Sequence, residues 1–202
     1  MLARTAVDTR SARRDATRAG ILEAAWDLAR RHGLAAITLR EVAGAVGMRA
    51  PSLYKHFASK NAMYDAMYAQ AVEQLSARLS RRRQGRDPRA TLRNRVRAFV
   101  AFCVEDPVRY QLMLERPVPG FEPTPETYRM ALAALSGTRT DLEATGITGA
   151  RALDLMRAIT TGIVSLQVAN DPAGTRWTRL VDEALDMFFA HYERAASRRV
   201  RR

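Results

Sequence analysis

The chain has 202 residues, of which 47% are hydrophobic, so it can build one ordinary core or two small ones. Its formal net charge of +12 is unevenly placed, because residues 1–100 carry 20 basic and 8 acidic side chains whereas residues 101–202 carry 13 of each. The single cysteine, Cys103, excludes an internal disulfide and favours a reducing compartment. There is no apolar run of about 18 residues and no signal-peptide pattern, so we expect a cytoplasmic protein.

The excess positive charge of the first half is typical of a nucleic-acid-binding module joined to a domain that binds something else. The alternative is a solvated basic surface without a partner. Residues 1–17 show little apolar periodicity, which predicts a mobile basic arm that could lie along DNA. The arginines of this arm are Arg4, Arg10, Arg13 and Arg14.

A first helix is predicted from Asp15 to His32, since apolar residues recur there at helical spacing and Gly33 ends the pattern. The side chains that we expect to be buried are Ile21, Leu22, Ala25, Trp26, Leu28 and Ala29.

Two short helices joined by a tight turn are predicted within residues 38–60. Thr38 and Glu41 fit an S/T-x-x-E capping box, so a helix begins at the residue after Thr38. Gly47 supplies the left-handed conformation that ends such a helix, and Pro51 is accepted in the first turn of the next one. This arrangement is a helix-turn-helix.

The second of these helices has a polar outer side. Leu53 and Phe57 lie four residues apart and are expected to point inward. The side chains left outside are donors suited to phosphate oxygens and base edges, namely Ser52, Tyr54, Lys55 and His56, with Lys60 just beyond.

The sequence Pro-Ser-Leu-Tyr-Lys-His-Phe-Ala-Ser-Lys over residues 51–60, after a helix ended by glycine, resembles the TetR family of bacterial repressors. The resemblance implies an all-α homodimer with an N-terminal helix-turn-helix DNA-binding domain and a C-terminal helical domain for ligand binding and dimerisation. It places Thr38, Tyr54, His56 and Lys60 at the DNA backbone, and Arg40, Ala50, Pro51 and Ser52 at base edges. We add Lys55 for its charge, and Arg49, which stands where the family usually has a Ser or Thr cap and is itself a poor cap.

These patterns predict three parts of the chain. Residues 1–60 would form the basic arm and DNA-binding domain, residues 61–87 a connecting helix and basic linker, and residues 88–202 the regulatory and dimerisation domain. The connecting helix is expected to run from Lys60 to about Arg82, with Ser59 as its cap.

The C-terminal half predicts further helices separated by a proline-rich loop over residues 117–125 and by a second break near Pro172. Their expected ranges are 88–105, a short helix after Pro107, 124–143, 148–170 and 174–196. The exposed arginines of the first, Arg89, Arg93 and Arg97, are interpreted as a solvated face, and the tail after Ser197 as disordered.

The last two helices carry apolar stripes wider than one partner helix would cover. Packed against their symmetry mates, they would form a four-helix interface, so we predict a homodimer through residues 148–196. Leu185 is expected to lie in that interface.

Residues 88–170 hold more large apolar and semi-polar side chains than a small core usually needs, which suggests a cavity for a small apolar effector. The candidate lining residues are Phe99, Phe102, Cys103, Tyr110, Met113, Tyr128, Met156 and Thr160. The alternative is that these side chains simply pack the core.

Nothing in the sequence indicates an enzyme, a cofactor or a metal site. The only histidines are His32, His56 and His191, too few and too scattered for a catalytic or zinc constellation, and no phosphate-binding glycine loop is present. We therefore expect a DNA-binding transcriptional repressor released from a palindromic operator by a small apolar ligand. The alternatives are a helix-turn-helix protein without a ligand, or an architectural protein with little sequence preference.

Overall fold

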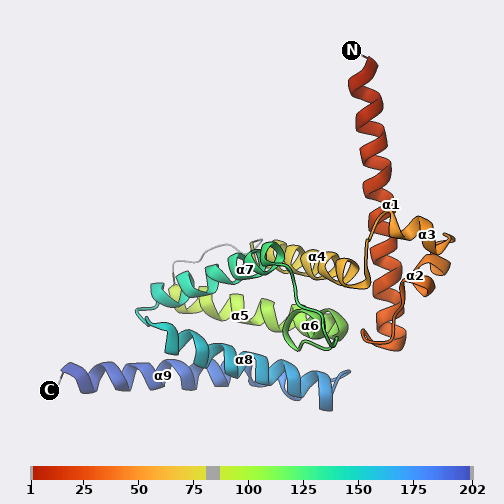
Figure 1. Cartoon of the computed structure of the whole chain (residues 1–202). Helices are drawn as coiled ribbons and strands as arrows, with labels where there is room; N and C mark the ends of the chain where they lie inside the picture. Colours follow the sequence, from red (N-terminus) through yellow and green to blue (C-terminus); the bar gives the residue numbers. More distant parts are fainter. Residues whose placement is uncertain (1, 81–86, 201–202) are drawn as a thin grey trace. The chain divides into compact units, whose positions relative to one another are not determined.

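The computed structural model describes residues 2–80 and 87–200, and within them the regular structure is entirely helical (Figure 1), as expected. The elements are α1 (Leu2–His32), α2 (Leu39–Ala45), α3 (Ala50–Tyr54), α4 (Lys60–Ser80), α5 (Pro88–Glu105), α6 (Pro107–Leu114), α7 (Pro125–Ala144), α8 (Ala150–Asn170), the short 3₁₀ helix η1 (Thr178–Leu180) and α9 (Val181–Val200).

The helices form two compact units. The first comprises Met1–Ala71 and Val108–Tyr128, and the second comprises Val72–Pro107 and Arg129–Arg202. Helix α4 begins in the first unit and ends in the second.

This division differs from the expected one in the placement of residues 108–128, which group with the helix-turn-helix and not with the C-terminal helices. Hydrogen bonds across 59 to 62 residues of sequence give the reason. Asp65 of α4 accepts from the backbone N–H of Thr124 at 2.8 Å and from the hydroxyl of Thr127 at 2.6 Å. The start of α7 is thereby fastened to the start of α4.

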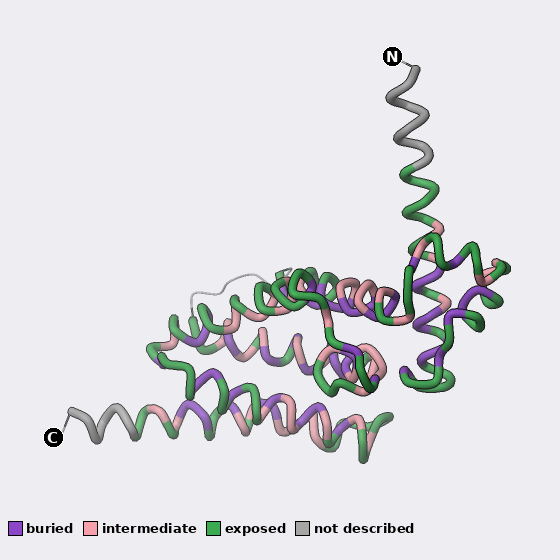
Figure 2. Tube along the Cα trace, viewed as in Figure 1, coloured by how far each residue is buried: buried purple, intermediate pink, exposed green. Residues whose placement is uncertain are grey.

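The core of the first unit lies along one side of the C-terminal half of α1, against α2 and α4 (Figure 2). The expected stripe is confirmed, since Ile21, Leu22, Ala25, Trp26, Leu28 and Ala29 are all buried. The expected start of this helix is wrong, because α1 begins at Leu2 and not at Asp15. Residues 2–17 contain no glycine or proline to interrupt a helix. The helix was not predicted there because these residues have too few apolar side chains to show a helical pattern.

The core of the second unit is built around α5, which packs against α8 and α9. Helix α8 is long and apolar enough, by length and composition alone, to cross a membrane. Core helices share this composition, and α8 buries Leu153, Met156 and Val164 inside the unit.

The arginines of α5 are solvated in part, since Arg89 and Arg97 are exposed and Arg93 is half-buried, but all three also pair with acids. Arg89 lies 2.6 Å from Glu193, Arg93 lies 2.6 Å from Asp186, and Arg97 holds Asp182 through two hydrogen bonds of 2.9 and 2.7 Å. These pairs join α5 to the acidic side of α9. The sequence did not indicate this pairing because the acids lie 85 to 104 residues away, beyond the reach of any local pattern.

Two expected boundaries are also corrected. The connecting helix α4 is described as far as Ser80, and the rest of its expected extent lies outside the described residues. The last helix of the chain does not begin at residue 174, because η1 precedes it and α9 starts at Val181. Helix α9 continues to Val200, so the expected disorder after Ser197 is wrong up to that residue, whereas residues 201 and 202 lie outside the description.

Candidate nucleic-acid interface

The capping box at the start of α2 is confirmed. The Glu41 backbone N–H donates to the Thr38 hydroxyl at 3.2 Å, and the Glu41 carboxylate accepts from the Thr38 backbone N–H at 2.9 Å and from its hydroxyl at 2.7 Å. These hydrogen bonds hold the pKa of Glu41 below its ordinary value. A charged carboxylate at a helix N-terminus also suits the helix dipole, so α2 has a fixed starting point.

The turn between α2 and α3 is set by Gly47, whose φ of +68° lies in the left-handed region. The N–H of Met48 closes the turn by donating to the carbonyl of Ala43 at 2.8 Å. Helix α3 then buries Leu53 completely, and Phe57 just beyond it is 1% exposed. These two side chains seat α3 in the core and leave its other side to the solvent.

Arg49 precedes α3 at the cap position and makes no side-chain cap hydrogen bond, as expected for arginine. The first turn of α3 is closed by backbone alone, because the N–H of Ser52 donates to the Arg49 carbonyl at 2.9 Å. The Arg49 side chain is exposed. The five-residue helix therefore lacks the cap that usually anchors its beginning.

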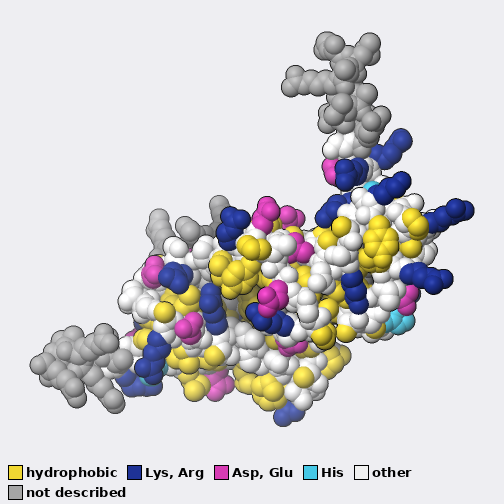
Figure 3. Space-filling view, viewed as in Figure 1, with side chains coloured by type: hydrophobic (Ala, Val, Ile, Leu, Met, Phe, Trp, Pro, Cys, Tyr) yellow, Lys and Arg dark blue, Asp and Glu magenta, His cyan; other side chains and the backbone are white. Residues whose placement is uncertain are grey.

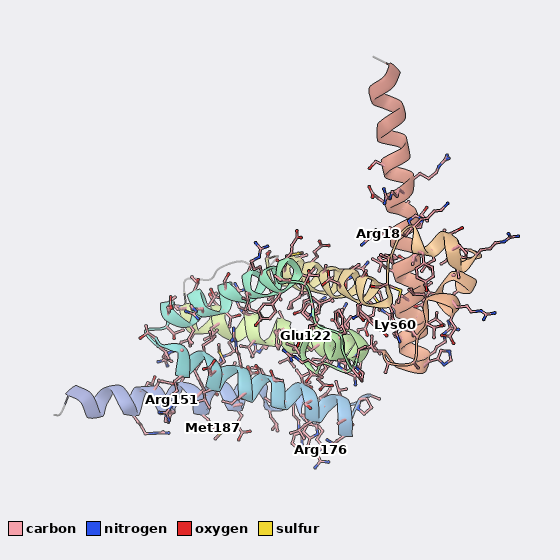
Figure 4. All side chains as sticks on the ribbon, in the orientation of Figure 1. Arg18, Lys60, Glu122, Arg151, Arg176 and Met187 are labelled. Atoms are coloured by element: carbon pink, nitrogen blue, oxygen red, sulfur yellow. The ribbon has the colours of Figure 1, made fainter. Side chains whose placement is uncertain are left out.

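Arg18 of α1 anchors the other end of α3, and sequence reasoning did not find it. Its guanidinium Nη1 donates to the backbone carbonyl of His56 at 2.8 Å, and its Cζ lies 4.2 Å from the centre of the Phe57 ring. Figure 4 labels Arg18 on α1. A long basic side chain one helical turn before the buried stripe of α1 was the only signal. Its partner lies 38 residues away and is a backbone atom, so no residue pattern could identify it.

The ten predicted DNA-binding residues lie on or beside α2 and α3, where dark blue basic side chains gather in Figure 3. Seven are exposed, namely Thr38, Arg40, Arg49, Pro51, Ser52, Tyr54 and Lys55, and three are partly buried, namely Ala50, His56 and Lys60. The Nδ1 atom of His56 is buried without a hydrogen-bond partner among the described residues. The exposed set can meet a DNA surface as it stands, whereas His56 presents only part of its ring.

Lys60 already has a contact inside the unit. Its Nζ donates to the carbonyl of Ala35 at 3.0 Å and lies 5.5 Å from the centre of the Tyr64 ring. Tyr64 donates its hydroxyl to the carbonyl of Leu34, and burial raises the pKa of Tyr64 to about 12, so the hydroxyl remains a donor at neutral pH. Together the two side chains hold the loop that leads into α2.

The eight candidate ligand-binding residues are divided between the two units. Tyr110, Met113 and Tyr128 belong to the first unit, whereas Phe99, Phe102, Cys103, Met156 and Thr160 belong to the second. Tyr128 is 52% exposed, and the hydroxyl of Thr160 is satisfied by the Met156 carbonyl of its own helix at 2.9 Å. Neither unit gathers the whole set.

No group of three or more His, Cys, Asp or Glu side chains in the described part of the chain is placed to hold a metal ion. What the first unit offers is a rigid pair of short helices with exposed donors, an arrangement that can bind phosphate and base edges in a DNA groove.

Comparison with known proteins also indicates a DNA-binding domain in this unit. The family model described as "Bacterial regulatory proteins, tetR family" matches residues 21–67, which run from the second half of α1 into α4. No curated protein matches the sequence.

Solved structures share the fold along most of the chain. A protein of unknown function from Rhodococcus sp. RHA1 covers 86% of this chain and 94% of its own, at 23% identity and a TM-score of 0.71. The TetR family transcriptional regulator PfmR from Thermus thermophilus covers 83% and 96%, at 22% identity and a TM-score of 0.63. RolR, solved in complex with resorcinol, covers 88% and 89%, at 17% identity and a TM-score of 0.59.

At these identities the structural likeness shows the fold alone, and the family model covers only residues 21–67. Residues 21–67 are therefore similar to the DNA-binding domain of the TetR family of bacterial regulatory proteins.

Proposed function

We propose that this DNA-binding regulator is a cytoplasmic repressor that binds a palindromic operator as a homodimer and leaves it when a small apolar molecule binds its C-terminal unit. The observation that carries the proposal is the exposed polar side of α3, which belongs to a helix-turn-helix whose two helices are each held by specific contacts. The capping box of Thr38 fixes α2, and Arg18 with the buried Leu53 fixes α3.

Two kinds of DNA contact follow from the residue chemistry. Arg40 is exposed in the first turn of α2, and a guanidinium there can grip O6 and N7 of guanine. Ser52 is exposed in the first turn of α3, near Ala50 and Pro51, and its hydroxyl can donate or accept a hydrogen bond at a base edge. Thr38, Tyr54, Lys55, His56 and Lys60 are proposed as contacts to the DNA backbone, where hydroxyl, imidazole and cationic groups are suitable donors. Arg49, exposed just before α3, is proposed as a further contact to base edges.

A homodimer through residues 148–196 is supported by apolar side chains that the protomer leaves uncovered on α8 and α9. Leu155 and Leu166 of α8 are 39% and 41% exposed, and Met187 of α9 is 67% exposed (Figure 4). Large exposed hydrophobic side chains on neighbouring helices mark a surface that a partner can cover. Leu185 is not on this surface, because it is 2% exposed inside its own protomer, so our expectation for that residue is wrong.

The small apolar effector is supported less directly. RolR, whose fold this chain shares, was solved with resorcinol bound. Buried Phe102, Cys103 and Met156 lie in the second unit and could rearrange around an apolar guest, since methionine and aromatic side chains adapt to varied shapes. By linkage, a ligand that prefers the free dimer must weaken operator affinity by the same factor by which the operator weakens ligand binding.

Selection of bound sequences from a random DNA pool tests the proposal. A homodimer should select an inverted repeat whose half-site centres are about 34–36 Å apart, or a multiple of that distance. Repeating the selection with Arg40→Ala should relax the preference at one base pair in each half-site, at a cost of about 1–3 kcal/mol. A pool that shows no enriched repeat would reject the operator, and equal weakening at all sites would make Arg40 a phosphate contact.

A further inference from the structure

A hollow of about 310 Å³ opens in the second unit between α5, η1 and the start of α9. None of the eight predicted ligand-binding residues lines it. The hollow has an apolar floor, which includes Val100 and Val104 of α5 and Val181 of α9. At its edge lie two arginines, Arg97 and Arg179.

The α5 wall is a single face of that helix. Arg97, Ala101 and Val104 follow the spacing i, i+4, i+7 and all three line the hollow. Helix α5 is the centre of the unit and Val100, beside this face, is 3% exposed. This wall therefore exists before any ligand arrives.

The opposite wall is held by a buried amide. Gln167 of α8 is 1% exposed, and its side-chain carbonyl accepts from the backbone N–H groups of Trp177 and Thr178 at 2.9 and 3.1 Å. Its NH₂ group donates to the carbonyl of Gly174 at 3.0 Å. Because one buried side chain makes all these bonds, the segment that carries Thr178 and Arg179 has a fixed path.

The charge at the edge of the hollow has a net positive balance. Arg97 uses Nε and Nη2 to hold the carboxylate of Asp182, which leaves Nη1 without a hydrogen bond to any described residue. The Arg179 guanidinium is exposed and makes no side-chain hydrogen bond or ion pair within the described ranges. Two unused donor groups thus stand beside one carboxylate that is already neutralised.

We propose that this hollow binds a small organic acid, with its carboxylate on Arg179 and Arg97 and its apolar body on the valine floor. A guanidinium fork matches the two oxygens of a carboxylate. The volume is at the lower end for ligand sites, which limits the acid to a small one.

The site stays open in the proposed homodimer. On α9, Asp182 at the hollow and Met187 on the apolar outer surface are five residues apart, which places them about 140° apart around the helix. A partner that covers Met187 would leave the Asp182 side of α9 in contact with α5. The site goes beyond the proposed apolar effector, because its ligand is an acid and its lining residues are different, and it rests on the proposed function only for its regulatory meaning.

Isothermal titration of the full-length protein, without DNA, tests the site with hexanoate as probe and hexanamide as its neutral counterpart. Hexanoate should bind in a saturable way, and hexanamide at least about tenfold more weakly, since it lacks the charge that Arg179 meets. Arg179→Ala should weaken hexanoate by about tenfold. The matched control is Arg176→Ala (Arg176 is labelled in Figure 4), which removes an exposed charge three residues earlier that is not among the lining residues of the hollow, and it should change the affinity less than about twofold.

A second variant tests the location. Ala101→Leu places a larger side chain in the hollow and should abolish hexanoate binding while the melting temperature stays close to that of the wild type. The proposal is overturned if hexanoate gives no saturable heat, if hexanamide binds equally well, if the two arginine variants behave alike, or if Ala101→Leu binds normally. Since no DNA is present, a failure here is distinct from a failure to find an operator.

Discussion

Arg18 should control how well the recognition helix α3 discriminates between DNA sequences. The change that tests this is Arg18→Ala. It removes the hydrogen bond of 2.8 Å to the His56 carbonyl and the guanidinium over the Phe57 ring. Because α3 has no side-chain cap at its beginning, no equivalent anchor at Arg49 can compensate.

The expected size of the effect follows from these two contacts. A hydrogen bond with a charged donor is worth about 1.5–3 kcal/mol, and Arg18 is exposed, so about 1 kcal/mol is appropriate after screening by solvent. An exposed cation–π contact adds about 0.5–1 kcal/mol. If α3 must be ordered again on binding, operator affinity should fall by about 1.5–2 kcal/mol, a factor of roughly 10 to 30.

The assay compares operator affinity, non-specific affinity and their dependence on salt. Loss of positioning should lower the ratio of specific to non-specific affinity and leave the log-log salt slope unchanged. Arg18→Lys should recover part of the specific affinity, since an ammonium can still donate to the His56 carbonyl. The control is Arg14→Ala, which removes an equally exposed charge one turn earlier in α1.

Two results would refute this reasoning. If Arg18→Ala weakens all DNA alike and reduces the salt slope by about 1, Arg18 is a phosphate contact. If Arg18→Ala and Arg14→Ala have the same operator affinity as the wild type, the contacts with His56 and Phe57 do not position α3.

Three further predictions follow from the described contacts. Glu41→Gln should lower the melting temperature at neutral pH. Because the pKa of Glu41 is depressed, its contribution to stability is present above the ordinary pKa of 4.5 and is lost as the pH falls through the lowered pKa. A difference in melting temperature between variant and wild type that is the same at all pH values would contradict this prediction. Lys60→Ala should reduce the salt slope of DNA binding by about 1, whereas an unchanged slope would leave Lys60 only its contact with the Ala35 carbonyl. Met187→Arg should give folded monomers on analytical ultracentrifugation, because Met187 is exposed and the new arginine would carry a charge into the interface. Leu185→Arg should instead unfold the protomer, because Leu185 is buried. A Met187→Arg variant that stays fully dimeric would place the interface elsewhere.

The helix-turn-helix could be predicted from sequence because its rules are local. Thr38 and Glu41 are three residues apart, and Gly47 acts on its own backbone, so each is recognisable without knowing the fold. The buried positions Leu53 and Phe57 follow from helical spacing alone.

The contacts that tie elements together could not be predicted, because they join residues distant in sequence. The acidic partners of the α5 arginines lie 85 to 104 residues further on, and a row of arginines on a helix reads equally well as a solvated face. Leu185 and Met187 illustrate a second limit. Both are apolar and close in sequence, but only the packing of α9 on its own protomer shows that Leu185 is 2% exposed and Met187 67%.

The most direct test of the central claim is the ratio of specific to non-specific DNA affinity for the wild-type protein, measured at one salt concentration with its selected site and with unrelated DNA. A sequence-specific regulator should show a ratio of about 10³ or more. A ratio near 1 would mean that the exposed donors on α2 and α3 read only the phosphate backbone, as in an architectural protein, and would contradict the account.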